Sequence, residues 1–199
     1  MSILISQKKD HYISVGQARY ATAVVAKYLN ADTVKVSTEF YKTILPAEMI
    51  FTKEDVSTSD KQVEKLTREL NIHYRSCIGS FIYLLSKRVD LSFALHELAK
   101  FSVNPGKVNF EGLIHLLRYI REDNTLGLKY YVDIIDAPVT DLLRQASTKT
   151  KNHLVTFSDS SWHDFPYTGR STLSYIIFYL GGPIDNGTHI PVPVAQSSA

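Results

Sequence analysis

Three successive stretches between Tyr74 and Ile120 repeat apolar residues at helical spacing, and this pattern restricts the fold more than any other feature of the chain. The stripes consist of Tyr74, Ile78, Phe81, Ile82 and Leu85, then Leu91, Leu95, Leu98 and Phe101, then Phe110, Leu113, Ile114, Leu117 and Ile120. Steps of three and four residues place each set on one face of a helix. Asp90 can cap the second helix, and Asn104-Pro105-Gly106 separates it from the third. Three linked amphipathic helices predict a small bundle.

The chain before this bundle is less regular. Apolar residues predict the tail of a strand at Ile3 to Ile5 and a helix that ends near Leu29. Residues 30 to 59 follow neither period and predict a long irregular connection. The spacing from Ser59 to Gln62 is that of a capping box, so a short helix of mixed charge is predicted through Leu70.

After the bundle, the apolar period changes from that of a helix to that of strands. The predicted strands are Leu126 to Val132, Leu154 to Phe157, Thr172 to Leu180 and Ile190 to Ala195. Gly181-Gly182-Pro183 predicts a bend, Asn186-Gly187 is typical of a hairpin turn, and Asp141 to Gln145 is a short helical candidate. The change near Asn152 predicts a domain boundary, with residues 1–151 in one domain and 152–199 in the next.

Charge and cysteine content limit the class of protein. A formal net charge of +2 is too small to indicate nucleic-acid binding by itself, so any basic surface must be local. The single cysteine, Cys77, cannot form an internal disulfide and is predicted to be a buried core residue in a reducing compartment. No apolar run reaches the roughly twenty residues of a membrane helix, and the N-terminal charges follow a very short apolar stretch, the reverse of a secretory signal. We expect a soluble, intracellular chain without membrane contact, in the cytoplasm or nucleus.

Asp159 is the candidate metal ligand. It stands at the end of an apolar strand, where a carboxylate can project into a site held by a rigid sheet, and magnesium prefers oxygen ligands. Asp164 and Asp185 are nearby in the sequence, the first in a predicted loop and the second beside the predicted turn. A solvated strand end is the alternative interpretation. The seven histidines show no spacing typical of a zinc site.

Four basic residues lie on or beside the second and third predicted helices: Lys100, Lys107, Arg118 and Arg121. They are the candidates for contact with nucleic-acid phosphates. A charge set of this kind also fits a solvated helix face, which is the alternative interpretation.

Several motifs resemble copia-type retrotransposon Pol polyproteins. Tyr74-Arg75-Ser76-Cys77-Ile78-Gly79-Ser80-Phe81-Ile82-Tyr83-Leu84, Arg88-Val89-Asp90-Leu91-Ser92-Phe93-Ala94, Leu98-Ala99-Lys100-Phe101, Leu117-Arg118-Tyr119-Ile120 and Leu126-Gly127-Leu128-Lys129-Tyr130 resemble the segment after the reverse transcriptase palm. Phe157-Ser158-Asp159-Ser160-Ser161-Trp162, Gly169-Arg170-Ser171-Thr172 and Val194-Ala195-Gln196-Ser197-Ser198 are similar to successive signatures at the start of the element's ribonuclease H. The resemblance covers nearly the whole chain.

The resemblance implies an α+β chain. A helical bundle like the thumb and connection of reverse transcriptase would be followed by the first three strands of an incomplete ribonuclease H-like fold. The parent would copy RNA into DNA and hydrolyse the RNA of the hybrid with two magnesium ions.

Asp159 matches the first aspartate among the family's metal ligands, and a glutamate and two further aspartates complete that site. The glutamate is expected directly after Ala199 and the polymerase aspartate pair before Met1. Tyr130-Tyr131-Val132-Asp133 resembles the polymerase metal-binding turn, but Ile134 stands in place of its second aspartate, so Asp133 is predicted to be a solvated strand end. We therefore expect no catalysis by the chain alone.

The expected residual function is weak, salt-sensitive contact with the backbone of an RNA·DNA hybrid or template-primer through Lys100, Lys107, Arg118 and Arg121. Other parts of the Pol polyprotein are further expected partners. One rival is a magnesium-dependent nuclease, in which Asp159 uses Asp164 and Asp185 or acids from a second chain. Another is a domesticated protein-interaction module with an exposed aromatic surface. The sheet after Asn152 would lack a covering helix, which predicts fraying or aggregation there.

Overall fold

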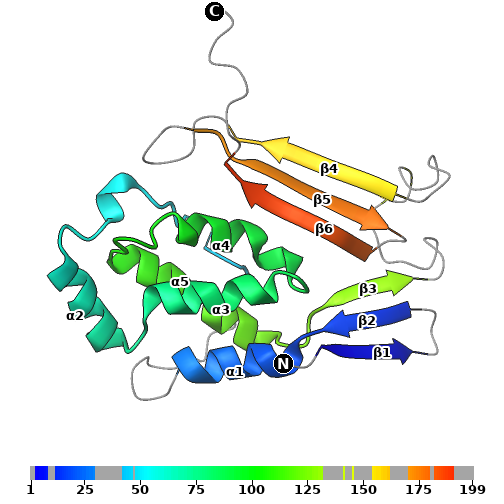
Figure 1. Cartoon of the computed structure of the whole chain (residues 1–199), viewed down its shortest axis with the longest axis horizontal. Helices are drawn as coiled ribbons and strands as arrows, with labels where there is room; N and C mark the ends of the chain where they lie inside the picture. Colours follow the sequence, from blue (N-terminus) through cyan, green and yellow to red (C-terminus); the bar gives the residue numbers. More distant parts are fainter. Residues whose placement is uncertain are drawn as a thin grey trace, which may run out of the picture.

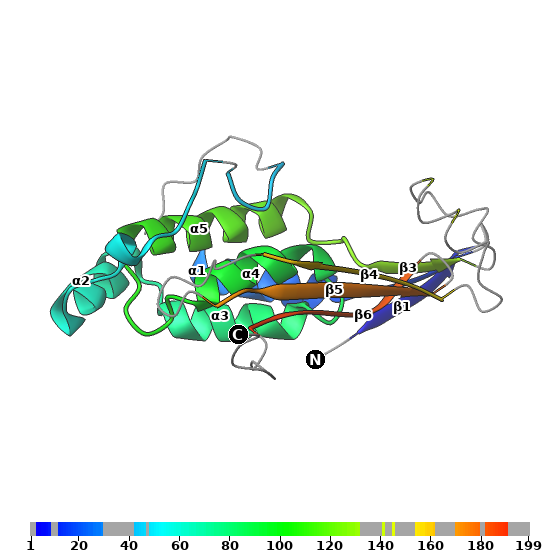
Figure 2. The ribbon, with the colours of Figure 1, turned by 90° about the horizontal axis from the view of Figure 1, so that it is seen from above.

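A group of helices and a set of strands lie side by side in the computed structural model, as Figure 1 shows. The structure describes residues 3–8, 12–29, 42–46, 48–131, 154–161, 170–179 and 182–190, together with residues 141 and 145. The helices are α1 (Ala18–Tyr28), α2 (Asp60–Leu70), α3 (Tyr74–Leu84), α4 (Ser92–Ala99) and α5 (Lys107–Glu122), with short 3-10 helices η1 (Lys53–Asp55) and η2 (Val89–Leu91). The strands are β1 (Leu4–Lys8), β2 (Tyr12–Gly16), β3 (Leu128–Tyr131), β4 (Leu154–Ser160), β5 (Leu173–Tyr179) and β6 (Gly182–His189). Viewed from above, α2 lies at one end of the elongated molecule and the strands β1 and β3 lie toward the other, whereas β4-β5-β6 begins beside α4 (Figure 2).

The three helices predicted from the apolar stripes are confirmed as α3, α4 and α5. Together with α1 they enclose one core, whose fully buried members include Cys77, Phe81, Leu84, Leu98, Phe110, Leu113, Leu116, Leu117 and Ile120. Phe110 packs edge-on against Tyr74, with the ring centroids 5.1 Å apart. Burial of apolar surface on this scale is the main stabilising contribution to a fold.

Two details of the predicted stripes are wrong. Ile82 is 57% exposed, because the buried face of α3 continues through Phe81 and Leu84 instead. Asp90 does not cap the second helix: it lies inside η2, and the N-cap of α4 is Leu91. Its carboxylate instead joins a buried polar cluster, described below.

Part of the predicted irregular connection packs against the helical core. The Ser57 hydroxyl donates to the Pro105 carbonyl oxygen at 2.7 Å, so this segment lies beside the start of α5. Gly106 is required there, because a Cβ at this position would overlap the carbonyl oxygen of Asp55. The capping-box spacing that predicted α2 is confirmed in part, since α2 begins after Ser59 but Ser59 makes no side-chain cap hydrogen bond.

The strands form two antiparallel sheets, in the orders β1-β2-β3 and β4-β5-β6. The sequence predicted part of β1 and the approximate places of β3, β4 and β5, whereas β2 and β6 were not predicted. The predicted Asn186-Gly187 turn is wrong, because both residues lie within β6. The chain reverses earlier, between the paired residues Tyr179 and Gly182, at the predicted glycine-rich bend. The strand predicted from 190 to 195 lies beyond the described residues, except for Ile190.

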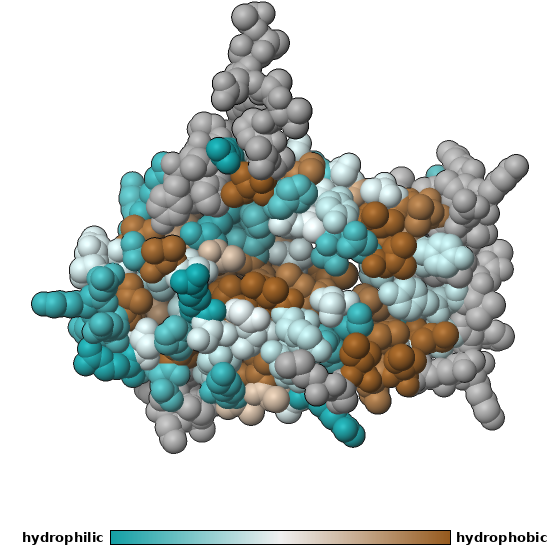
Figure 3. Space-filling model, in the orientation of Figure 1, coloured by the Kyte–Doolittle hydropathy of each residue, from teal (hydrophilic) through white to brown (hydrophobic). Residues whose placement is uncertain are grey.

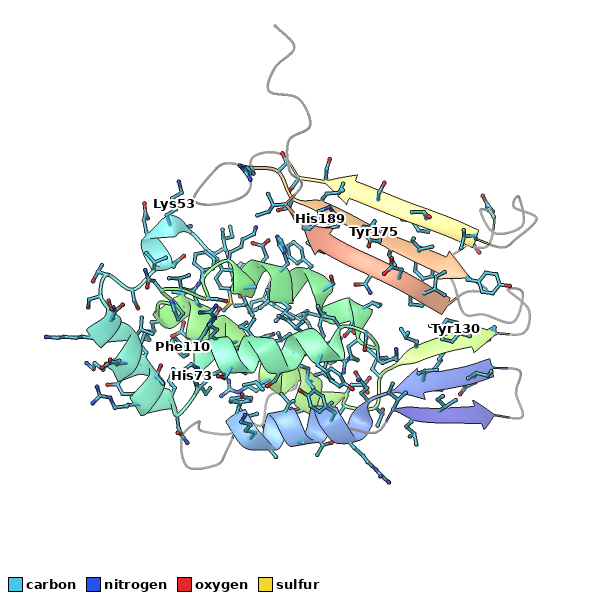
Figure 4. The ribbon with its side chains drawn as sticks, viewed as in Figure 1. Lys53, His73, Phe110, Tyr130, Tyr175 and His189 are labelled. Atoms are coloured by element: carbon cyan, nitrogen blue, oxygen red, sulfur yellow. The ribbon has the colours of Figure 1, made fainter. Side chains whose placement is uncertain are left out.

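The two sheets meet where β3 runs beside β6 (Figure 1). The Tyr130 hydroxyl donates to the Pro183 carbonyl oxygen at 2.9 Å, and Figure 4 shows Tyr130 on the strand nearest to β6. Gly182 allows this approach, because a Cβ there would overlap the Lys129 carbonyl oxygen. Strands from both predicted domains are therefore in contact, and the boundary near Asn152 stays a prediction.

Apolar side chains also lie on the outside of the molecule. Figure 3 shows them gathered over the β1-β2 hairpin. The exposed residues there are Ile3, Leu4, Ile5 and Ile13. Within the described residues, no helix is long and apolar enough to cross a membrane.

Candidate functional site

Asp159 lies on β4, one residue before the end of that strand, as the apolar run before it predicted. Its side chain is exposed, and Oδ1 accepts a hydrogen bond from the Ser160 backbone N–H at 2.9 Å. In the sheet register Asp159 pairs with Ser174, which pairs in turn with Thr188. Directly paired residues project from the same face of a sheet. The nearest cross-strand neighbours of the candidate metal ligand are therefore two hydroxyl side chains rather than acids.

Asp185 lies on the opposite face of this sheet. It pairs with Ile177, which is three positions from Ser174 along β5, and side chains alternate between the two faces of a strand. Asp185 Oδ2 accepts a hydrogen bond from the Tyr175 hydroxyl at 3.2 Å, and the charge of Asp185, with some burial, raises the pKa of Tyr175. Figure 4 shows Tyr175 on the middle strand of this sheet. Asp159 and Asp185 cannot share one ion in this arrangement.

The described residues do not fit the magnesium site of the parental nuclease. A site of that kind needs several oxygen ligands from neighbouring elements. No group of three or more acidic, histidine or cysteine side chains in the described part of the chain could hold a metal ion. Asp164, the other acid proposed from the sequence, lies outside the described residues, as does Asp133.

A hollow of about 290 Å³ lies beside Asp159, between β4-β5-β6 and the start of α4. Phe93 of α4 and Phe157 of β4 form apolar parts of its wall, and Asp90 of η2 also lines it. Three side-chain hydroxyl groups connect the start of α4 to the sheet beside this hollow. The Thr188 hydroxyl lies 3.2 Å from that of Ser92 and 3.2 Å from that of Ser174, so these groups form a continuous chain. The hollow therefore combines apolar walls with a hydroxyl network and a carboxylate at its rim.

Arg88 and Asp90 form a polar cluster at one side of this hollow. The Arg88 side chain is only 2% exposed; its Nε donates to Asp90 Oδ1 at 3.0 Å and its Nη2 to Oδ2 at 2.8 Å. Arg88 Nη1 donates to the Asp123 carbonyl oxygen at 2.8 Å, and the Tyr119 hydroxyl donates to Asp90 Oδ2 at 3.2 Å. Burial opposes the charge of Arg88, but the hydrogen bonds and charge of Asp90 outweigh it and raise the pKa of Arg88. The cluster holds η2 against the end of α5.

This cluster was not predicted from the sequence, because its partners are far apart in the chain. The available signal was that Arg88 stands two residues before Asp90, at the start of a predicted helix. An arginine is rarely buried without a partner, so a nearby aspartate is a candidate partner. This signal indicates a local ion pair at most. Only the packing of α5 against η2 supplies Tyr119 and the Asp123 carbonyl.

The four basic residues proposed from the sequence differ in accessibility. The Lys100 side chain is only 2% exposed and bonds Glu97 at 2.7 Å. Lys107 is 78% exposed and lies 3.7 Å from Glu111 on the next helical turn. Arg121 contacts Glu122 at 2.8 Å, and Arg118 is partly buried on the same helix. Lys107 is thus the most accessible of the four candidates.

Comparison with known proteins gives two matches of limited identity. A segment of 129 residues is 29% identical to secreted RxLR effector protein 161 of Plasmopara viticola and covers 64% of this chain and 80% of that protein. A segment of 119 residues is 24% identical to the retrovirus-related Pol polyprotein from transposon TNT 1-94 of Nicotiana tabacum and covers 59% of this chain but 8% of the polyprotein. No protein-family model and no solved structure match the chain. The chain is therefore similar to a small part of a transposon Pol polyprotein.

Proposed function

We propose that the chain is a piece of a retrotransposon Pol protein, in which the end of a reverse transcriptase leads into the start of a ribonuclease H. The observation that carries this proposal is the similarity to a transposon Pol polyprotein over 119 residues. The motifs around Asp90 and Asp159 support the more specific assignment to reverse transcriptase and ribonuclease H. In this proposal the helical part corresponds to the thumb and connection, and β4-β5-β6 to the first strands of the nuclease.

As a separate polypeptide, this piece would bind an RNA·DNA hybrid without hydrolysing it. Hydrolysis by the parent requires two magnesium ions held by several carboxylates. Asp159 has hydroxyl neighbours on its sheet face, and Asp185 projects from the other face. Both observations support the absence of cleavage.

Binding to the hybrid would be electrostatic and weak. Lys107 and Arg118 are eleven positions apart on α5, close to three helical turns, so they lie along one face of the helix. Glu111 lies between them on that face and reduces its positive potential. Contacts with phosphates release counterions, so the affinity should fall steeply with salt concentration. Lys100 contributes little in this proposal, because its side chain is nearly buried.

The test is a hydrolysis and binding assay with a labelled RNA·DNA hybrid and magnesium. We expect no cleavage above that of the Asp159→Ala variant, and binding that weakens between low and high salt. Lys107→Ala should lower the slope of log affinity against log salt by about 1, whereas Lys100→Ala should leave it nearly unchanged. Cleavage by the parent chain that is lost in Asp159→Ala would refute the proposal that the fragment is inactive and would support the nuclease alternative.

A protein-interaction module is the second candidate function. The effector protein of Plasmopara viticola is matched over most of its length, so a region like this one occurs as a separate protein. The exposed apolar residues of the β1-β2 hairpin give such a module a surface for a partner. Binding that persists at high salt and is lost in Ile5→Lys would favour this candidate over contact with nucleic acid.

A further inference from the structure

The hollow beside Asp159 has the shape and walls of a small-molecule site. It lies between two separate elements, the face of β4-β5-β6 and the start of α4, and measures about 290 Å³. Phe93 is 64% exposed although it borders the hollow, and Phe157 lies on the facing strand. Aromatic rings in the wall of a concavity give a ligand a large apolar contact area. A volume of this size suits a small molecule rather than a protein segment.

The charged side chains among the described residues that line the hollow are the two aspartates Asp90 and Asp159. Asp90 is neutralised by Arg88, whose guanidinium holds both carboxylate oxygens. In contrast, among the residues that the structure describes, Asp159 accepts one hydrogen bond, from the Ser160 backbone N–H, and takes part in no ion pair. Asp159 therefore leaves a net negative charge at the rim, which disfavours a phosphate or carboxylate ligand and favours a cation.

The hydroxyl chain supplies acceptors for N–H groups. Ser92, Thr188 and Ser174 are linked at 3.2 Å, and Asn186 lines the hollow beside them. A hydroxyl has two acceptor lone pairs, and its proton can rotate toward its neighbour in the chain. These oxygens can accept hydrogen bonds from a ligand while they remain bonded to one another.

We propose that this hollow binds a small, flat organic cation of the guanidinium or amidinium type. A planar cation can stack on the rings of Phe93 and Phe157 while its N–H groups reach Asp159 and the hydroxyl chain. A metal ion would not use the aromatic walls, and a neutral ring would not use Asp159. This inference does not depend on the proposed retrotransposon origin.

The test uses the full chain and benzamidinium chloride, with neutral benzamide as the matched probe. Amide chemical shifts of residues 92, 174 and 188 should move in a saturable manner with benzamidinium and much less with benzamide. Asp159→Asn should weaken benzamidinium binding roughly two- to fivefold, and Phe93→Leu by a similar factor of roughly two to five. Asp185→Asn, which removes a carboxylate from the opposite face of the same sheet, should leave binding unchanged.

Equal binding of benzamide and benzamidinium would overturn the proposal, as would an Asp159→Asn variant that binds as well as the parent chain. Loss of binding in Asp185→Asn would place the cation on the opposite face of the sheet and would also overturn the proposal. Comparison of N-acetylarginine amide with a capped pentapeptide that contains one arginine identifies the source of the cation. Equal affinities support a free small-molecule cation, whereas tighter binding of the pentapeptide would assign the hollow to an arginine side chain of a polypeptide and overturn the small-molecule assignment.

Discussion

The helical core and the sheet β4-β5-β6 bury their apolar residues to very different extents. The core encloses side chains from α1, α3, α4 and α5 on all sides, and many of them are fully buried. In the sheet, Val155 is the only large apolar side chain of the described residues that is buried. The sheet touches the rest of the molecule through α4 and β3, and hollows lie beside its contact with α4. The comparison indicates that the helices form the stable unit and that the sheet depends on its attachments.

Replacement of a core aromatic should have the largest effect on stability. Phe110→Ala removes a fully buried ring that packs on Tyr74, and should lower the free energy of unfolding by about 3–5 kcal/mol. Phe93→Ala, on the exposed side of α4, should change it by less than about 0.5 kcal/mol. Chemical denaturation followed by circular dichroism measures both. Similar losses in the two variants would contradict the contrast between core and surface.

Loss of the Arg88 side chain should be the next largest effect. Arg88→Ala leaves the Asp90 carboxylate and the Asp123 carbonyl oxygen without their donors, and should cost about 2 kcal/mol, because Asp90 retains some access to water. Arg121→Ala, which removes an arginine from a pair near the surface, should cost less than about 1 kcal/mol. Unfolding in urea distinguishes the two. An Arg88→Ala variant as stable as Arg121→Ala would show that the cluster does not hold η2 to α5.

Alkaline unfolding should report on the core through Tyr74. Burial raises the pKa of Tyr74 above its ordinary value of 10.0, and its hydroxyl donates to the Leu98 carbonyl oxygen at 2.8 Å. Above pH 10 the unfolded chain loses this proton while the folded chain keeps it, so stability should fall by about 1.4 kcal/mol per pH unit for this group.

In Tyr74→Phe this part of the pH dependence should disappear. The free energy of unfolding at neutral pH should fall by about 1 kcal/mol, because the hydrogen bond of the hydroxyl is lost. Tyr179→Phe, at an exposed position of β5, serves as the control and should keep the alkaline slope. The slope is measured by urea titrations at several pH values between 8 and 11. An unchanged slope in Tyr74→Phe would mean that Tyr74 ionises in the folded chain.

Weakening of the attachment between β3 and β6 should have the smallest and most local effect. Tyr130→Phe removes the hydrogen bond to the Pro183 carbonyl oxygen and should cost about 0.5–1 kcal/mol. Amide hydrogen exchange should accelerate in β5 and β6 while α3 and α5 keep their protection. Equal acceleration in the helices would show that sheet and helices unfold as one unit.

The sequence predicted the helical part well because its signals are local. The spacing of Tyr74, Ile78 and Phe81 needs no knowledge of distant residues, and neither does the break at Pro105 and Gly106. The sheet was predicted less well. Asn186-Gly187 has the composition of a hairpin turn, yet the pairing of β6 with β5 places Gly187 opposite Tyr175, whose ring lies over it. Here the register of neighbouring strands outweighed the local turn preference.

In the candidate site, too, some features could be predicted from the sequence and others could not. Asp159 could be selected from the sequence as a carboxylate at a strand end, and its position on β4 is confirmed. Its relation to Asp185 could not be obtained from the sequence, because only the register of β4, β5 and β6 places the two carboxylates on opposite faces of the sheet. The burial of Lys100 was also hidden, since an exposed and a buried lysine look alike in a helical pattern.

By itself, the sequence determined the places of α3, α4 and α5, the buried state of Cys77, and the resemblance to a Pol polyprotein that the comparison supports at a coarse level. The tertiary structure decided which polar groups meet: Arg88 with the end of α5, Ser92 with Thr188, and Asp159 with hydroxyls instead of acids. The reason is physical. Helical periodicity arises from interactions within a few residues, whereas strand register and helix-to-sheet packing join residues that are tens of positions apart.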